Sequence, residues 1–300
     1  MRALRRMLAV LVLLGAAGTA TAAEREPIRI GWTAWSDAEF TSTLVARLVE
    51  QRLGRPVERV LVDIALQYQG VSDGELDAMV MAWLPDTHRD YYQRFAGRFV
   101  DLGPIYTGAR LGWVVPAYVP AEVLGSIEDL NDPEVARRLR RQIYGIDPGA
   151  GLMRLSDEAV AAYGLEAYNL IASSGAAMTA MMERAIRREQ WIVATAWSPH
   201  WMFHRWELRY LEDPRGVLGG RERVHALARK GFYRDAPEVF ELLGRLYLPL
   251  KELEAAIAEA RETSYAEAVD RYVRTHPERV HYWLTGELKR APTHEDTDDD

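Results

Sequence analysis

Apolar residues in the first half of the chain alternate between two spacings. Short continuous apolar runs, typical of buried strands, are followed by segments with apolar residues three and four positions apart, typical of helices. Residues 37–53 show the helical spacing most clearly and end at Gly54, a residue type that commonly follows helices. The pattern predicts strands at 27–32, 57–62 and 76–83, and helices at 37–53, 65–71 and 85–95.

The second half of the chain continues this alternation and then becomes helical. Ser126 and Asp129 have the spacing of a capping box, which marks a helix start. Alternating strands and helices indicate an α/β fold with parallel sheets, in which ligands bind beyond the carboxyl ends of the strands. The order of the elements fits two α/β lobes followed by a helical return. Strands are predicted at 111–115, 142–146 and 191–196, and helices at 152–163, 174–186, 237–247, 249–262, 265–274 and 277–284.

The first residues have the pattern of a secretory signal peptide. Three arginines precede an apolar run at 8–14, and Ala20-Thr21-Ala22 is an A-x-A cleavage signal. The alternative is an uncleaved anchor, but the apolar run is shorter than the about 20 residues that span a membrane. We therefore predict a signal peptide at 1–22 and a periplasmic protein of a Gram-negative bacterium. A lipid anchor is not expected, because the chain has no cysteine.

Charge and composition exclude several classes of protein. The 300 residues carry a formal net charge of −7, which becomes −10 when residues 1–22 and their three arginines are removed. Such a chain has no strong positive field to attract nucleic acid. The absence of cysteine excludes thiolate zinc sites and cysteine nucleophiles. Residues 291–300 are rich in aspartate, and we expect an acidic disordered tail there.

Three of the nine tryptophans stand at the ends of predicted strands. They are Trp35, Trp83 and Trp197, and each lies where a strand gives way to a loop with serine or proline. Indole faces that converge at strand ends form an electron-rich box, which attracts quaternary ammonium groups. Core packing is the alternative, and it is the role we expect for Trp32, Trp191 and Trp283.

A glycine-rich turn and a pair of histidines are the other candidate features. The turn at 147–151 precedes a predicted helix, and its backbone amides are suited to holding an anion. His200 and His204 have a spacing that zinc sites use, but no H-E-x-x-H motif is present, and we predict no metal and no cofactor. The G-x-S-x-G, Walker and G-x-G-x-x-G motifs are also absent from the sequence. A carbohydrate-binding protein or a glycosidase stays as the alternative, since tryptophans also stack on sugars.

Four motifs carry a resemblance to a known family. They are Gly31-Trp32-Thr33-Ala34-Trp35-Ser36-Asp37, Ala82-Trp83-Leu84-Pro85, Gly145-Ile146-Asp147-Pro148-Gly149-Ala150-Gly151 and Trp197-Ser198-Pro199-His200-Trp201. The chain over residues 28–250 resembles the glycine betaine and proline betaine binding proteins of ABC importers. The resemblance implies a type II periplasmic binding protein fold, with two lobes, a mainly parallel sheet in each, and two crossover segments. It also implies no enzymatic activity and delivery of the ligand to a membrane permease driven by a cytoplasmic ATPase.

The resemblance further implies where the lobes divide and which tryptophans bind the ligand. Lobe I comprises 23–115 and 213–290, including the C-terminal helices, and lobe II comprises 116–212. The ligand lies between them. The tryptophans assigned to the cage are Trp35, Trp83 and Trp197, with Trp113 and Trp201 in reserve. Choline or carnitine as the ligand, or a sensory role, is the alternative within the same fold.

A betaine also has a carboxylate, which needs hydrogen-bond donors. Asp37 either faces the ammonium group or caps the following helix, and capping is favoured because Asp37 directly precedes the apolar periodicity. The turn at 148–151 lacks the polar amide side chain of the choline-binding branch, which favours a betaine over choline. The candidate donors are the backbone around Ala38 and Glu39, the turn at Gly149 and the side chain of His200.

Overall fold

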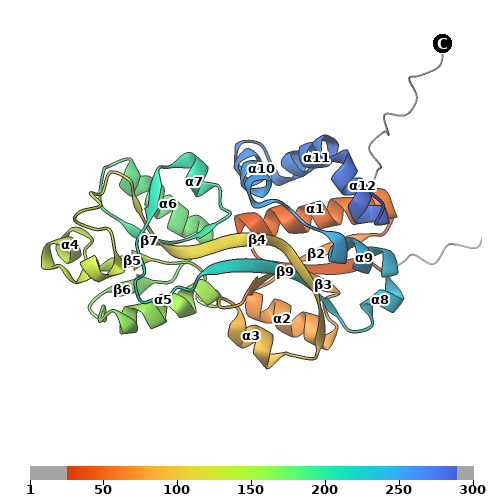
Figure 1. The fold of residues 1–300 in the computed structure, drawn as a ribbon, viewed down its shortest axis with the longest axis horizontal. Coiled ribbons are helices and arrows are strands. Elements are labelled where there is room, and N and C mark those ends of the chain that lie inside the picture. The colour runs from red at the N-terminus through yellow and green to blue at the C-terminus, as the bar shows by residue number, and fades with distance from the viewer. Residues whose placement is uncertain (1–25, 289–300) are drawn as a thin grey trace, which may run out of the picture.

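Two groups of helices and strands lie at opposite ends of the molecule and are joined by long strands (Figure 1). The computed structural model describes residues 26–288. We call residues 26–115 and 213–288 lobe I and residues 116–212 lobe II. The expected signal peptide and acidic tail lie outside the described residues.

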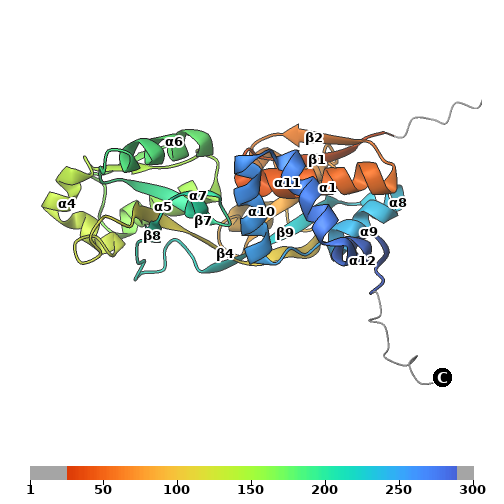
Figure 2. The ribbon, with the colours of Figure 1, turned by 90° about the horizontal axis from the view of Figure 1, so that it is seen from above.

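Lobe I is built from both ends of the described chain. The C-terminal helices return to pack against α1, as the predicted helical return requires (Figure 2). The N-terminal elements are β1 (Ile28–Trp32), α1 (Ser36–Leu53), β2 (Val57–Leu61), α2 (Ile64–Asp73), β3 (Ala78–Leu84) and α3 (Arg89–Arg94). The C-terminal elements are α8 (Phe232–Asp235), α9 (Pro237–Arg245), α10 (Leu250–Glu262), α11 (Tyr265–Thr275) and α12 (Pro277–Thr285).

Lobe II is a continuous stretch of chain. Its elements are the 3-10 helix η1 (Ile127–Asn131), α4 (Pro133–Arg138), β5 (Gln142–Tyr144), α5 (Gly151–Ala162), β6 (Asn169–Ile171), α6 (Gly175–Ile186), β7 (Val193–Ser198), α7 (Met202–Arg205) and β8 (Leu208–Tyr210). The strands β4 (Phe99–Pro116) and β9 (Arg221–Arg229) run between the two groups of elements (Figure 1).

The nine strands within residues 26–288 belong to one mixed sheet, in the order β2-β1-β3-β9-β4-β7-β5-β6, with β8 paired to β4. The pairs of β1 with β2 and β3, and of β5 with β6 and β7, are parallel, as the sequence predicts. β4 and β9 pair antiparallel with their neighbours, so each lobe keeps a three-stranded parallel part and the whole sheet is mixed. The reason is the path of the chain: β4 leaves lobe I and β9 returns to it.

β4 serves both lobes as a single strand. It pairs with β9 from Phe99 to Arg110 and with β7 from Arg110 to Val114, so its partner changes at Arg110. The sequence predicts only the apolar part of β4, at 111–115, because glycine, proline and charged residues precede it. It predicts no strand at β9, since charged residues interrupt the apolar run there.

Of two predicted helix starts, at Ser126 and at Pro85, the structure confirms the first and moves the second. Ser126 and Asp129 form the predicted capping box, at the start of η1. The segment after Pro85 forms turns, so that the helix predicted from residue 85 begins at Arg89. No helix among residues 26–288 combines the length and the apolar character that crossing a membrane requires.

The tryptophans expected in the core differ in their burial. Trp283 is 1% exposed and belongs to the core of lobe I, as predicted. Trp32 and Trp191 are only partly buried. Each has a guanidinium group over its ring, that of Arg59 at 4.2 Å from the Trp32 centroid and that of Arg138 at 4.6 Å from the Trp191 centroid. Each of these two indoles therefore has a cationic side chain over its ring, and Trp191 also packs against the hydrophobic core.

Candidate ligand-binding site

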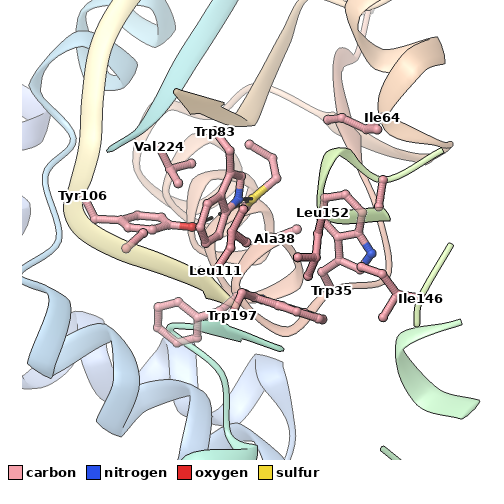
Figure 3. Close-up of a cluster of buried hydrophobic side chains, with 14 of the residues drawn as sticks. Trp35, Ala38, Ile64, Trp83, Tyr106, Leu111, Ile146, Leu152, Trp197 and Val224 are labelled. Atoms are coloured by element: carbon pink, nitrogen blue, oxygen red, sulfur yellow. Dashed lines mark hydrogen bonds between the residues drawn. The ribbon is translucent and has the colours of Figure 1, made fainter. Parts of the chain in front are cut away.

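Trp35, Trp83 and Trp197 lie around one pocket between the lobes (Figure 3). Trp35 follows β1 as the N-cap of α1, Trp83 is in β3, and Trp197 is in β7. Trp35 of lobe I faces Trp197 of lobe II, with ring centroids 6.3 Å apart and an angle of 60° between the ring planes. The structure thus brings together the three tryptophans that the sequence analysis selects.

We call the space between Trp35, Trp83 and Trp197 the cage pocket. The rest of its wall is mostly apolar. The three tryptophans themselves are 3–7% exposed. Aromatic rings that are shielded from water hold cations more strongly than exposed rings. The wall is completed by Leu111, Ile146, Leu152, Thr87, His88 and the first residues of α5.

The N–H group of each of the three indoles donates a hydrogen bond to another residue of the protein. Trp35 Nε1 donates to Asp147 Oδ2 at 3.0 Å, and Trp197 Nε1 donates to Asp37 Oδ1 at 2.9 Å. Trp83 Nε1 donates to the sulfur of Met81 at 3.1 Å, within its own lobe. Because an indole has no other polar hydrogen, its ring face is what it offers to a ligand.

Asp37 is completely buried in the first turn of α1. Its second oxygen, Oδ2, accepts a hydrogen bond from the hydroxyl of Tyr106 at 2.7 Å. Burial raises the pKa of the Asp37 carboxyl, and the hydrogen bonds from Tyr106 and Trp197 act in the opposite direction. The expectation that Asp37 caps α1 is wrong, because Trp35 occupies the N-cap position.

The glycine-rich turn leads into α5 at the wall of the cage pocket. Ala150 is the N-cap of α5, and Gly151 and Leu152 are its first two residues. Within residues 26–288, the amides of Gly151 and Leu152 donate to no protein acceptor. Free amides at the start of a helix, together with the helix dipole, favour a negatively charged group. The pocket therefore has aromatic faces and, beside them, a helix start whose free amides are suited to an anion.

Two buried histidines stand close to the cage. His88 lies in the pocket wall, and its Nδ1 accepts from the amide of Trp83 at 3.0 Å. His200 packs its ring 4.5 Å from that of Trp197, and its Nδ1 accepts from the amide of Met202 at 3.0 Å. Burial lowers the pKa of each histidine to about 3, so both rings are neutral at pH 7, with the proton on Nε2. His88 is a site residue that the sequence does not predict, although it lies in the loop that follows β3 and Trp83.

A second, larger hollow lies on the other side of Trp35 and Trp197. Residues of both lobes line it. Glu39, His200 and Trp201, which the sequence analysis places with the ligand, line this hollow and not the cage pocket. Burial raises the pKa of the Glu39 carboxyl, against the opposing effect of the Arg59 guanidinium.

Three other expected site residues line neither of these two spaces. Trp113 is fully buried in β4, and its Nε1 donates to Ser156 Oγ of lobe II at 2.9 Å, so it is a core residue. Ala38 is also fully buried in α1. The carbonyl of Gly149 accepts from the hydroxyl of Tyr91 at 2.9 Å, which makes it part of the contact between the lobes. Among residues 26–288, no group of three or more histidine or acidic side chains is arranged to hold a metal ion.

Polar contacts join the lobes beside the cage. Arg154 of α5 donates from Nη2 to the carbonyl oxygens of Asp86 and Thr87 in lobe I, at 2.8 and 3.4 Å. Ser198 Oγ donates to Glu254 Oε1 at 2.6 Å, from β7 to α10. These contacts require the two lobes to be close together, so the structure represents the closed form.

Two α/β lobes that close over an aromatic pocket define a binding protein that encloses a small ligand between its lobes. The family model "substrate binding domain of ABC-type glycine betaine transport system", named OpuAC, matches residues 26–275. The chain belongs to this family.

Known proteins are similar to this chain in sequence and structure. The glycine betaine/carnitine transport binding protein GbuC of Listeria monocytogenes is 32% identical over 156 residues, which are 51% of this chain and 52% of that protein. The chain thus matches about half the length of this curated relative. Lactococcal OpuAC, solved closed with glycine betaine, has a TM-score of 0.80 and 32% identity, over 86% of this chain and 99% of that one.

Two further solved structures share the fold. The glycine betaine and L-proline binding protein ProX of Borrelia burgdorferi has a TM-score of 0.80 and 30% identity, over 86% of this chain and 97% of that one. A choline binding protein in complex with choline has a TM-score of 0.79 at 22% identity, over 88% and 93% of the two chains. At 22% identity, the similarity to the choline binding protein concerns the fold alone.

Proposed function

We propose that this chain captures glycine betaine, or a closely related zwitterion with a quaternary ammonium group, between its lobes. The observation that carries the proposal is that Trp35, Trp83 and Trp197 meet, from both lobes, around a pocket that also contains the free start of α5. The aromatic part and the anion-binding part match the two ends of a betaine. The ligands named for GbuC and lactococcal OpuAC support the same class.

The cage holds the trimethylammonium end of the ligand. A quaternary ammonium group has no N–H to donate, so it is recognised by the quadrupoles of the ring faces. Each indole contributes about 0.5–2 kcal/mol, and three contribute about 1.5–6 kcal/mol. Micromolar binding needs about 8 kcal/mol, so the carboxylate end and the removal of water must supply the remainder.

The start of α5 holds the carboxylate. The amides of Gly151 and Leu152 are free to donate to it, and the Nε2–H of His88 in the same pocket wall is a third donor. These groups replace Ala38, Glu39 and His200 as the first candidates, because those three are absent from the cage pocket wall. Choline would bring a neutral hydroxyl to an end suited to an anion, so a betaine is favoured.

Ligand binding and closure of the lobes form one step. The cage is complete only when Trp197 of lobe II faces Trp35 and Trp83 of lobe I. A ligand that touches both lobes binds the closed form better than the open form and shifts the equilibrium towards closure. The closed form then docks on the permease of the transport system.

The protein acts outside the cytoplasm and catalyses no reaction in this proposal. Residues 1–22 have the pattern of a cleavable signal peptide, which supports a periplasmic location. The partner is an inner-membrane permease of the ABC type, as the description of the family indicates. The ligand leaves chemically unchanged.

Calorimetry on the protein without residues 1–22 tests the proposal. Glycine betaine, proline betaine, carnitine, choline and ectoine are titrated separately, and neutral oligosaccharides are added while tryptophan fluorescence is recorded. We expect a betaine to bind at micromolar or lower concentration and choline to bind at least about tenfold more weakly. Binding of an oligosaccharide without binding of any quaternary ammonium compound would overturn the proposal.

A further inference from the structure

Asp37 and Asp147 each accept a hydrogen bond from a tryptophan of the opposite lobe. Asp37 of lobe I accepts the Nε1–H of Trp197 from lobe II, and Asp147 of lobe II accepts the Nε1–H of Trp35 from lobe I. We propose that the two carboxylates are positioning residues of the cage, each fixing the indole that the opposite lobe contributes. The inference rests on the proposed function and adds the groups that orient the rings.

Asp37 serves two aromatic side chains at once. Oδ1 accepts from Trp197 at 2.9 Å and Oδ2 accepts from Tyr106 at 2.7 Å, and the carboxylate is fully buried. Tyr106 in turn packs edge-on against Trp83, with centroids 6.4 Å apart and an interplanar angle of 86°. One carboxylate therefore fixes the Trp197 indole directly and supports the Trp83 ring through Tyr106.

Asp147 links the second indole to the anion-binding end. Its carboxylate accepts from Trp35 at 3.0 Å, and its carbonyl accepts from the amide of Ala150 at 2.9 Å, in the turn that begins α5. The same turn therefore holds the Trp35 ring and presents the free amides of Gly151 and Leu152. Movement of this turn changes the aromatic and the anion-binding parts of the site together.

The carboxylates act through the rings and do not contact the ammonium group. Neither Asp37 nor Asp147 is part of the cage pocket wall. Both oxygens of Asp37 already accept hydrogen bonds. An indole rotates about two side-chain bonds, and a hydrogen bond at Nε1 fixes its face towards the pocket. The negative acceptor also pushes electron density towards the ring, which strengthens its attraction for a cation.

Both bonds cross between the lobes, so they form only when the lobes close. An open form leaves the Nε1–H of Trp35 and of Trp197 to water. When a ligand closes the lobes, the protein therefore forms two charge-assisted hydrogen bonds between its own residues, and their free energy adds to the apparent affinity for the ligand. The expected consequence is that loss of either carboxylate speeds release of the ligand more than it slows capture.

Double-mutant cycles separate an action through the indole from a direct action. Asp37→Asn, Trp197→Phe and the double variant are titrated with glycine betaine, and a second cycle combines Asp147→Asn with Trp35→Phe. Phenylalanine keeps an aromatic face but has no N–H to donate. We expect each Asp→Asn change to weaken binding about tenfold in the parent protein. Where its own indole partner is phenylalanine, we expect less than about twofold for Asp147→Asn, and for Asp37→Asn only the smaller loss that acts through Tyr106.

A crossed cycle is the matched control. Asp37→Asn combined with Trp35→Phe pairs two residues without a mutual hydrogen bond, so we expect the two losses to multiply. The Nε1–H proton signals of Trp35 and Trp197 in the betaine-bound protein give a second readout. Each signal should shift in the Asp→Asn variant of its own partner and not in that of the other.

The outcomes distinguish this inference from the proposed function. If the parent protein binds betaine and Asp37→Asn weakens binding equally with or without the Trp197 indole, Asp37 does not act through Trp197 and the inference fails alone. The inference would also be overturned if the Nε1–H signals of Trp35 and Trp197 did not shift in either Asp→Asn variant. If the parent protein binds no betaine, the proposed function fails, and the positioning roles fail with it.

Discussion

Gly151 of lobe II lies directly against Thr87 of lobe I. A Cβ atom built on Gly151 would be 2.1 Å from the carbonyl oxygen of Thr87 and 2.7 Å from its methyl group. No side chain, however small, fits between these two segments without a shift of one of them. The close approach of the lobes at the anion-binding end of the pocket therefore depends on glycine at position 151. Gly149, two residues earlier, has no atom within 4 Å of its Cβ position.

Gly151→Ala should hold the lobes apart and weaken betaine binding at least about tenfold. The added methyl group meets Thr87 only in the closed form, so the open form is not strained. Calorimetry measures the affinity, and small-angle scattering with saturating betaine measures closure. Gly149→Ala is the matched control, and its affinity should equal that of the parent protein. Equal, unchanged affinities for both variants would contradict the closed geometry.

Arg154→Met should weaken betaine binding about three- to tenfold. The substitution keeps the length of the side chain and removes the charged donor that bonds to the carbonyls of Asp86 and Thr87 across the lobes. Glu158→Gln is the control, because it removes the ion pair that Arg154 makes within α5 and leaves the contact between the lobes. Titration of both variants checks the prediction. A loss with Glu158→Gln as large as with Arg154→Met would show that the helix, not closure, is responsible.

Trp83→Leu should reduce betaine affinity at least about tenfold. Leucine keeps an apolar side chain in the pocket wall but has no aromatic face for the ammonium group. Because Trp83 is 3% exposed, unfolding in urea must be followed alongside, so that lost stability is separated from lost affinity. Trp283→Leu is the control: Trp283 is equally buried but lies in α12, so its loss should lower stability and leave affinity unchanged. Similar affinities of the two variants would remove Trp83 from the site.

The two buried histidines should make the protein less stable as the pH falls below 6.5. Burial lowers the pKa of His88 and of His200 to about 3 in the folded state, against about 6.5 in the unfolded chain. Above pH 6.5 both are neutral in either state, so their contribution is fully present. Below it only the unfolded state gains protons, and the free energy of unfolding falls by up to about 1.4 kcal/mol per pH unit for each histidine.

Urea unfolding at pH 7.5, 6.5 and 5.5 measures this slope. Burial also raises the pKa of carboxyl groups such as those of Asp37 and Glu39, so comparing the parent protein with a histidine variant isolates the part of the slope that belongs to that histidine. His200→Gln should reduce the slope, since glutamine accepts the Met202 amide without taking up a proton. His204→Gln, at an exposed position, serves as the control. A slope that is unchanged in His200→Gln would mean that His200 is protonated in the folded protein.

Much of the site could be predicted because it depends on local sequence. Trp35, Trp83 and Trp197 each stand at the end of a strand, and such ends meet where lobes face each other. The turn before Gly151 combines glycines with a following helix, which is a local signal for an anion site. A short stretch of sequence contains each of these features.

The remaining features depend on contacts between distant segments. Asp37 and Trp197 are 160 positions apart, so helix periodicity around Asp37 suggests a cap and gives no sign of its partner. Trp113 also stands in a strand, and only the packing of Ser156 beneath it shows that it belongs to the core. The strand β9 is hidden because its charged residues interrupt the apolar pattern, although its backbone pairs with both β3 and β4.

One comparison tests the central claim most directly. Glycine betaine and the acid in which a neutral tert-butyl group replaces trimethylammonium have nearly the same shape and the same carboxylate. Competition calorimetry on the parent protein gives both affinities. If the tryptophan cage recognises positive charge, betaine binds at least about tenfold more tightly, since three ring faces contribute about 1.5 kcal/mol or more. Equal affinity for the two compounds would contradict the account, because the pocket would then select shape and not charge.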